Sequence, residues 1–222
     1  MQPMSDYTGD VAVGGPADTR TLPGLKITKI AVGPMNNNAY LLRDPSSGAT
    51  LLIDAANEAE RLLDLLPEGR LDTVVTTHQH GDHWQALAEV AQRTRARTVA
   101  HPLDAGPLPV APDRLVEEGD TVTVGDAALT VIHLRGHTPG SMALRYDDPS
   151  GTSHVFTGDS LFPGGVGNTR GDTDAFASLI DDVERKLFGA LADDTWVYPG
   201  HGPDTTIGAE RPALPEWRAR GW

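Results

Sequence analysis

The sequence has no cysteine among its 222 residues, and this absence excludes several kinds of site. Without thiols there is no disulfide framework, cysteine-ligated iron–sulfur cluster, thiolate nucleophile or thiolate zinc site. No segment approaches the ~20 apolar residues of a transmembrane helix, and the first 24 residues lack the apolar core of a signal peptide. We therefore expect no contact with a membrane and a cytoplasmic location.

Basic residues are also scarce, because 18 Lys and Arg face 31 Asp and Glu and give a net charge of −13. Proteins that bind nucleic acid neutralise phosphates with clustered Lys and Arg. The densest basic stretch here, residues 93–97, is short and has the pattern of a solvated helix end. We expect a small-molecule substrate and no nucleic-acid partner.

The length suits a single domain with a sizeable core, and no repeat divides the chain. Residues 1–24 contain Gly14, Gly15, Pro16 and Pro23 and predict a flexible N-terminal arm. We expect one domain over residues 25–222.

Three histidines and an aspartate lie within six positions, in the stretch His78-Gln79-His80-Gly81-Asp82-His83. The preceding apolar, β-branched run 71–77 predicts a buried strand, so the cluster lies where a strand ends. Neutral imidazole and carboxylate are ligands for zinc and related transition metals. Four such ligands are more than one tetrahedral ion takes from so short a segment, which favours two ions.

Three further residues of ligand type follow predicted strands. His137 lies in Gly-His-Thr-Pro-Gly at 136–140, Asp159 in Thr-Gly-Asp-Ser at 157–160, and His201 in Tyr-Pro-Gly-His-Gly at 198–202. Each lies beside glycine, where the backbone can turn sharply and approach an ion closely.

His-x-His-x-Asp-His, Gly-His-Thr-Pro-Gly, Thr-Gly-Asp and Gly-His-Gly occur here in the order found in the metallo-β-lactamase superfamily, which the chain resembles over residues 25–202. Within it, the chain is most similar to glyoxalase II-like hydrolases. The resemblance implies a metal-dependent hydrolase that uses a hydroxide bound by two metal ions to cleave a small thioester. It also implies an α/β fold, the αββα sandwich of this superfamily.

The same resemblance assigns the ligands. It gives His78, His80 and His137 to one metal, Asp82, His83 and His201 to the second, and makes Asp159 the bridge. The cofactors implied are two divalent ions, zinc first, with iron or manganese as alternatives. Asp82 is the one ligand that we also expect to act in catalysis, by orienting water or carrying a proton to the leaving group.

Other functions on this fold stay open. A single iron held by His78, His137 and Asp159 would make the protein a persulfide dioxygenase. A lactonase would show a tyrosine phenol beside the metals, for which Tyr40 is a candidate. A cysteine-type β-lactamase is excluded by composition, and Asp159 argues against the three-histidine type. A binding protein with a vestigial site is the alternative that is not an enzyme.

The resemblance to glyoxalase II itself is partial. Asn168 stands where that enzyme usually has a basic residue, and only 21 residues follow His201 in place of a helical domain that grips glutathione. Basic side chains that remain candidates to contact substrate are Arg211, Arg218, Arg220 and His101.

The hydrophobic pattern predicts strands alternating with helices. Strands are expected over residues 25–32, 39–43, 49–54, 114–124 and 127–134, and helices over 58–66 and 176–187. The strands over 114–124 and 127–134 are assigned to the second half of the fold.

Overall fold

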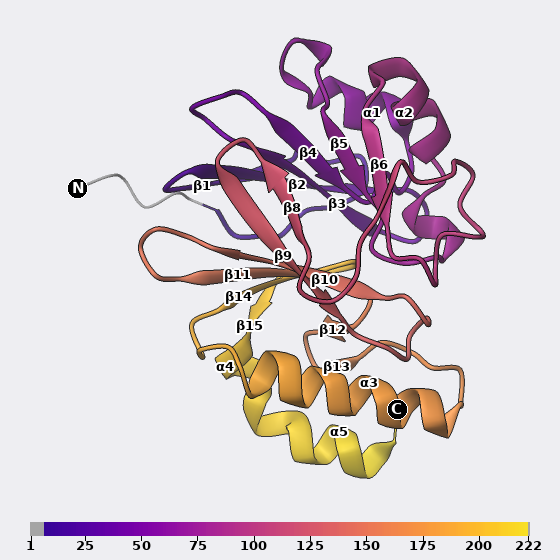
Figure 1. Ribbon diagram of the computed structural model, residues 1–222. Helices are drawn as coiled ribbons and strands as arrows, with labels where there is room; N and C mark the ends of the chain where they lie inside the picture. Colours follow the sequence, from indigo (N-terminus) through magenta and orange to yellow (C-terminus); the bar gives the residue numbers. More distant parts are fainter. Residues whose placement is uncertain (1–6, 222) are drawn as a thin grey trace.

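Two β-sheets lie face to face at the centre of the protein, seen in a computed structural model that describes residues 7–221 (Figure 1). The first sheet has seven strands in chain order, β1-β2-β3-β4-β5-β6-β7, with antiparallel pairs up to β4 and parallel pairs from β4 to β7. Its strands are β1 Asp18–Leu22, β2 Leu25–Val32, β3 Asn37–Arg43, β4 Thr50–Ile53, β5 Thr73–Val75, β6 Arg97–Ala100 and β7 Arg114–Leu115.

The second sheet has six strands in the order β15-β14-β11-β10-β9-β8. Only the β11–β14 pair is parallel, so the chain crosses over a helix between these two strands. The strands are β8 Thr121–Val124, β9 Ala127–His133, β10 Met142–Asp147, β11 Ser153–Gly158, β14 Trp196–Pro199 and β15 Thr205–Thr206. A separate hairpin joins β12 Leu161–Phe162 to β13 Gly165–Val166.

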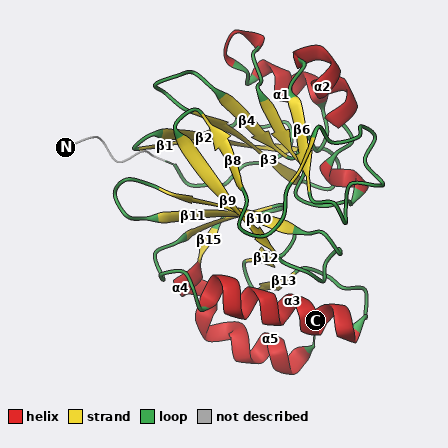
Figure 2. Ribbon diagram, in the orientation of Figure 1, coloured by secondary structure: helices red, strands yellow, loops and turns green. Residues whose placement is uncertain are grey.

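Helices cover the outer face of each sheet (Figure 2). α1 Ala59–Asp64 and α2 Leu87–Thr94 lie over the first sheet, and α3 Thr173–Val183, α4 Ile207–Glu210 and α5 Leu214–Arg220 lie over the second. This layering is the αββα sandwich that the resemblance implied, which confirms the expected fold. Within residues 7–221, no helix combines the length and the apolar character needed to cross a bilayer.

Alternation along the strands builds the three apolar layers. On β2, Leu25 and Ile27 point into the core between the sheets, whereas Ile30 and Val32 point toward α1 and α2. α3 begins at Asp172, whose side chain accepts hydrogen bonds from the backbone N–H groups of residues 174 and 175. Its buried Phe176, Leu179, Ile180 and Val183 pack on the outer face of the second sheet. The helix expected from this spacing is present.

Two expectations are wrong in part. Residues 18–22 of the expected flexible arm form β1, which pairs in register with β2, because β2 would otherwise leave an unpaired edge. Residues 1–6 of that arm lie outside the described part. The segment 114–124 is not one strand, because a turn at Gly119 divides it. Its start is β7 in the first sheet, and its end is β8 in the second.

Candidate metal centre

The structure brings the seven expected ligand residues together at one end of the sandwich, although they come from four separate loops. The strand ends that carry them are those of β5, β9, β11 and β14, which lie at the same edge of the two sheets. Carboxyl ends of parallel strands meet at one edge, which explains how distant motifs converge. The residues are His78, His80, Asp82, His83, His137, Asp159 and His201.

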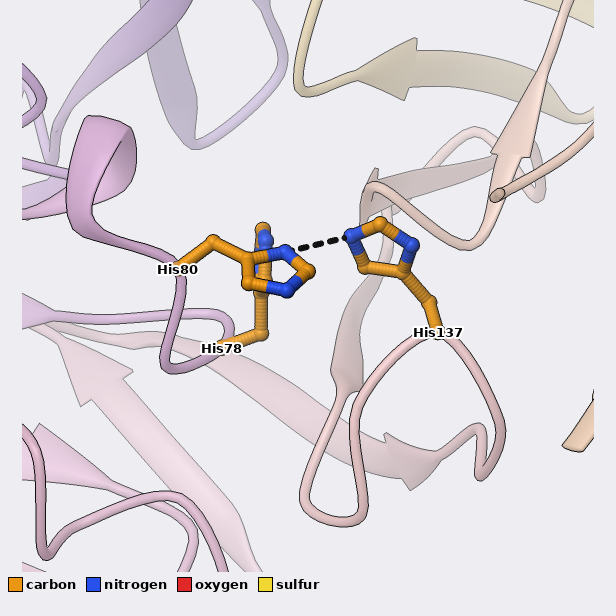
Figure 3. Close-up of side chains that lie close together, drawn as sticks. All are labelled: His78, His80 and His137. Carbon is orange, nitrogen blue, oxygen red and sulfur yellow. Dashed lines mark hydrogen bonds between the residues drawn. The ribbon is translucent and has the colours of Figure 1, made fainter. Parts of the chain in front are cut away.

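One group consists of His78, His80 and His137, whose ligand atoms lie within 4.8 Å of one another. Figure 3 shows a ring nitrogen of His80 directed at a ring nitrogen of His137, with His80 Nδ1 2.9 Å from His137 Nε2. Metal–nitrogen bonds of 2.0–2.1 Å in a tetrahedron would place two ligand nitrogens about 3.3 Å apart. The observed distance of 2.9 Å is slightly shorter than this, so the two nitrogens lie close enough together to bind the same ion.

The second group consists of Asp82, His83 and His201. Its three inter-ligand distances are 3.2 Å between the histidine Nε2 atoms, 3.5 Å from Asp82 Oδ2 to His83, and 3.4 Å from Asp82 Oδ2 to His201. All three are close to the ~3.3 Å edge of a tetrahedral site. This group therefore has the dimensions of a cation site.

Asp159 lies between the two groups. Its Oδ2 is 3.5 Å from His137 Nε2 and 3.4 Å from His201 Nε2, one residue in each group. Asp159 Oδ1 and His78 Nε2 are buried and have no hydrogen-bond partner among the described residues. Buried polar atoms without partners are costly, and a cation between them would remove the cost. The donor set fits two divalent ions with Asp159 shared between them.

The close packing around Asp159 depends on glycine. A Cβ atom at Gly200, next to His201, would lie 2.2 Å from Asp159 Oδ1, a distance at which atoms overlap. The glycine beside this ligand therefore has the role that the sequence predicted, close approach of the backbone to the site.

The two groups differ in charge. Burial lowers the pKa of His78 and of His137, which keeps both imidazoles neutral and able to bind a metal. Burial would also lower the pKa of His83, but the Asp159 and Asp54 carboxylates outweigh it and raise the pKa to about 10. A metal ion that binds His83 therefore displaces a proton.

The second nitrogen of four ligand histidines is held by a neighbouring group. His78 Nδ1 lies 3.0 Å from Thr77 Oγ1, and His83 Nδ1 lies 2.8 Å from Asp54 Oδ2. His137 and His201 place Nδ1 against backbone carbonyls of Asn168 and Met35, at 2.9 and 3.0 Å. Such contacts fix the ring orientation and select the nitrogen that faces the metal.

Two polar residues near the ligands were missed in the sequence. Asp54 accepts hydrogen bonds from Thr77 N and Oγ1 as well as contacting His83, and Asn37 Nδ2 donates to Asp82 Oδ2 over 2.7 Å. Both are buried, at 1% exposure. The signal for Asp54 was present, because an aspartate directly after the apolar run 51–53 mirrors the other ligand positions, which also follow strands.

Several other candidates lie away from the ligands. Tyr40 is buried and donates its hydroxyl to Pro199 O over 2.7 Å, so it packs in its strand. His101 is buried and stacks on His133. Arg211 is bound to Asp193 and to two backbone carbonyls, and Arg218 pairs with acidic residues of the α3 region, so both are surface interactions of the C-terminal helices. Arg220 lies near Gly164.

A cavity of about 410 Å³ opens beside His80 and His137. Arg135 and Arg170 line it, but only Arg135 is paired, with Asp182. The Arg170 guanidinium forms no ion pair among residues 7–221, and together with burial its charge lowers the pKa of His80. A free cation in an acidic protein beside candidate ligands makes this cavity suited to an anion.

Comparisons with known proteins agree with the motifs. Residues 32–201 match the family described as the metallo-beta-lactamase superfamily. A protein named hydroxyacylglutathione hydrolase from Fuscovulum blasticum is 38% identical over 169 residues, covering 75% of this chain and 62% of that relative. The chain therefore spans less than two thirds of that relative's length.

Solved structures share the fold over most of the chain. The crystal structure of ETHE1 from Myxococcus xanthus is 30% identical, covers 87% of this chain and 84% of that one, and has a TM-score of 0.74. The crystal structure of the BLEG-1 B3 metallo-beta-lactamase is 27% identical, covers 86% of this chain and 99% of that one, and has a TM-score of 0.73.

Proposed function

The chain belongs to the metallo-β-lactamase superfamily, and on that premise we propose that it is a metal-dependent hydrolase that cleaves a small thioester. The observation that carries the proposal is the position of Asp159, between two groups of three ligand residues that each have the dimensions of a cation site. When bound there, two divalent ions lower the pKa of a shared water and polarise a carbonyl.

The residues of the chain have separate tasks in this proposal. His78, His80 and His137 would hold one ion, Asp82, His83 and His201 would hold the other, and Asp159 would be shared between them. Asp82 has a second task, to orient the attacking water or carry a proton to the leaving group, and Asn37 Nδ2 donates to its Oδ2 over 2.7 Å. Zinc is the first choice for both ions, since imidazole and carboxylate suit it.

A thioester suits a site with this set of groups. Water adds to the carbonyl carbon, the carbon–sulfur bond breaks, and a carboxylic acid and a thiol are released. A thiol has a pKa of about 8.5, so the thiolate leaves without a strong general acid. We propose that Arg170 binds an anionic group of the thiol portion, because it is the unpaired cation of the cavity beside His80.

A lactone substrate is less favoured by the same structure. The described tyrosine hydroxyls are engaged elsewhere, with Tyr7 donating to Asp204, Tyr40 to Pro199 and Tyr146 to Pro23, while Tyr198 accepts from Arg20. None of these phenols contacts a candidate ligand, so the feature that would indicate a lactonase is missing from residues 7–221.

A persulfide dioxygenase is the second candidate, and the likeness to ETHE1 from Myxococcus xanthus favours it. In that reading His78, His137 and Asp159 hold a single iron, and Asp159 Oδ2 lies 4.0 and 3.5 Å from their Nε2 atoms. Two histidines and one carboxylate are the ligands of many non-haem iron oxygenases.

Elemental analysis of protein purified without chelator, combined with a substrate panel, separates these functions. We expect two equivalents of divalent metal and thiol release from a 2-hydroxyacyl thioester. The panel should also contain a persulfide, a lactone and a β-lactam, assayed by oxygen uptake, ring opening and loss of the lactam absorbance. One equivalent of iron with oxygen uptake from the persulfide, and no thiol release, would replace the hydrolase with the dioxygenase.

A further inference from the structure

Asp104 is a buried carboxylate outside every ligand motif, in the loop that follows β6. It is 1% exposed. Its Oδ2 accepts hydrogen bonds from Gln79 N, over 3.0 Å, and from the hydroxyl of Thr138, and its Oδ1 accepts one from Gly140 N, over 2.7 Å. Both carboxylate oxygens are therefore occupied by groups from two other loops.

These partners are the neighbours of one group of candidate ligands. Gln79 lies between His78 and His80, whereas Thr138 directly follows His137. A single side chain thus joins the two loops that supply all three residues of the first group, in addition to the backbone hydrogen bond of 3.1 Å from Met142 N to Thr77 O beside them. Removing a buried acceptor of this kind leaves its donors without partners, which is costly.

The Gly140 backbone shows how closely the His137 loop approaches Asp104. A Cβ atom at Gly140 would lie 2.8 Å from the backbone nitrogen of Asp104, so only glycine fits there. Ser141 Oγ lies 2.7 Å from Thr138 Oγ1, and this contact adds a second restraint to the hydroxyl that donates to Asp104. Asp104 and these neighbours therefore form a cluster of specific contacts between the loops.

The second group of ligands has its own carboxylate, Asp54, which contacts His83 directly. Within residues 7–221, Asp104 forms no hydrogen bond or ion pair with a candidate ligand side chain, and it acts on backbone and hydroxyl groups beside the candidate ligands. Asp54 also accepts from Thr77 N and Oγ1 beside His78, so its contacts reach both groups, whereas those of Asp104 lie beside the first group alone.

We propose that Asp104 is a positioning residue that sets the spacing between the His78–His80 loop and the His137 loop, and thereby the metal affinity of the first group alone. The proposal rests on the proposed metal site but not on the identity of the substrate. When the spacing relaxes, His137 Nε2 moves away from His80 Nδ1, and the three ligand atoms no longer converge.

Asp104→Asn tests this, because an amide has one acceptor oxygen and cannot accept from all three partners. The measurement is zinc affinity in competition with a chromophoric chelator, with the occupancy of each group read by anomalous scattering. We expect the affinity of the His78–His80–His137 group to fall about 10- to 100-fold, as for other residues that support ligands, and that of the Asp82–His83–His201 group to stay unchanged.

Asp44→Asn is the matched control, because Asp44 is also 1% exposed and also accepts several hydrogen bonds, from the turn residues Ser46 and Ser47 and from Asp126 N. It should lower the melting temperature without changing either affinity. Equal losses at both groups in Asp104→Asn, or the same pattern in the control, would reduce Asp104 to a residue that only stabilises the fold.

A second pair of variants tests the same proposal if Asp104→Asn does not fold. Thr138→Val removes one hydrogen bond to Asp104, and Thr98→Val removes the equivalent bond between Thr98 and Asp113, with both threonines 3% exposed. Only Thr138→Val should weaken the first group. If wild-type protein binds no metal, the proposed function fails together with this inference, whereas equal loss at both groups overturns this inference alone.

Discussion

His83 Nδ1 lies 2.8 Å from Oδ2 of Asp54, a buried aspartate whose backbone has a φ of 58°. A left-handed backbone is uncommon for a residue other than glycine. Here it occurs directly after β4, and the carboxylate reaches Thr77 and His83. The same carboxylate accepts from Thr77 N and Oγ1, so it holds the strand end and the ligand ring at once.

This contact gives a prediction for Asp54→Asn. The single oxygen of the amide cannot accept from Thr77 N, Thr77 Oγ1 and His83 Nδ1 together. The His83 ring therefore loses its fixed orientation. We expect about 10- to 100-fold weaker zinc binding in the Asp82–His83–His201 group, with the other group less affected. Site-resolved occupancy measures it, and preserved occupancy of the His83 group would show that backbone packing alone orients the ring.

The bridging position of Asp159 predicts a different result. If the protein has the proposed function, Asp159→Ala removes a ligand that both groups share, so both ions should be lost together and thioester turnover should fall to background. His137→Ala and His201→Ala should each empty mainly one group. Elemental analysis and anomalous occupancy distinguish these outcomes. Two retained ions with near-normal turnover in Asp159→Ala would remove this residue from the mechanism.

The sequence predicted the candidate ligands because their signal is local. Four candidate ligands directly follow one strand, namely His78, His80, Asp82 and His83. The other three each lie beside a glycine, namely His137, Asp159 and His201, so residues of ligand type occur together with turn residues. The αββα layers were also predictable, because alternation of apolar residues shows which strands are covered and the resemblance gives the order of the motifs.

The supporting residues were less predictable, because their roles depend on contacts between distant segments. Asp104 acts on residues 25 and 34 positions away, and Lys29 binds a carboxylate 175 positions away. A short edge strand such as β1 has no strong alternation of its own and exists because β2 offers it an unpaired edge. Residues 114–124 are divided by a turn because β7 pairs in the first sheet and β8 in the second. The local sequence does not show which sheet each part joins.

Arg170 gives a prediction about the substrate. Arg170→Gln removes the unpaired cation beside His80, so the kcat/KM for a thioester with a carboxylate on its thiol portion should fall about tenfold, mainly through KM. A thioester without that charge should be unaffected. Arg114→Gln is the control, because Arg114 is an exposed arginine that lines a separate cavity. Equal losses for both thioesters would contradict the role of Arg170 in binding an anion.

Lys29 and Asp204 form a fully buried ion pair, 2.7 Å apart, and Lys29 Nζ also donates to Gly202 O beside His201. Lys29→Met leaves Asp204 buried without its cation and should lower the free energy of unfolding by about 3 kcal/mol. Urea unfolding of the metal-free protein measures this. The double variant Lys29→Met/Asp204→Asn should recover part of the loss, and a double variant no more stable than the single one would argue against a penalty from the unpaired charge.

The last prediction concerns acid, and it depends on Asp182. Burial would raise the pKa of this aspartate, but its hydrogen bonds with Arg135 and the nearby Lys186 outweigh burial and lower it to about 2. A depressed carboxyl pKa stabilises the folded state above the unfolded value of about 3.9, and this contribution disappears as the pH falls through about 2. We expect Asp182→Asn to cost about 2 kcal/mol at pH 7 and about half of that at pH 3, because the wild-type carboxylate has then lost part of its advantage. Urea unfolding of both proteins at pH 7, 5 and 3 gives the difference directly, with Asp181→Asn, an exposed neighbour paired with Arg218, as the control. A difference that stays constant across this range would show that Asp182 contributes through packing beside Arg135 and not through its charge.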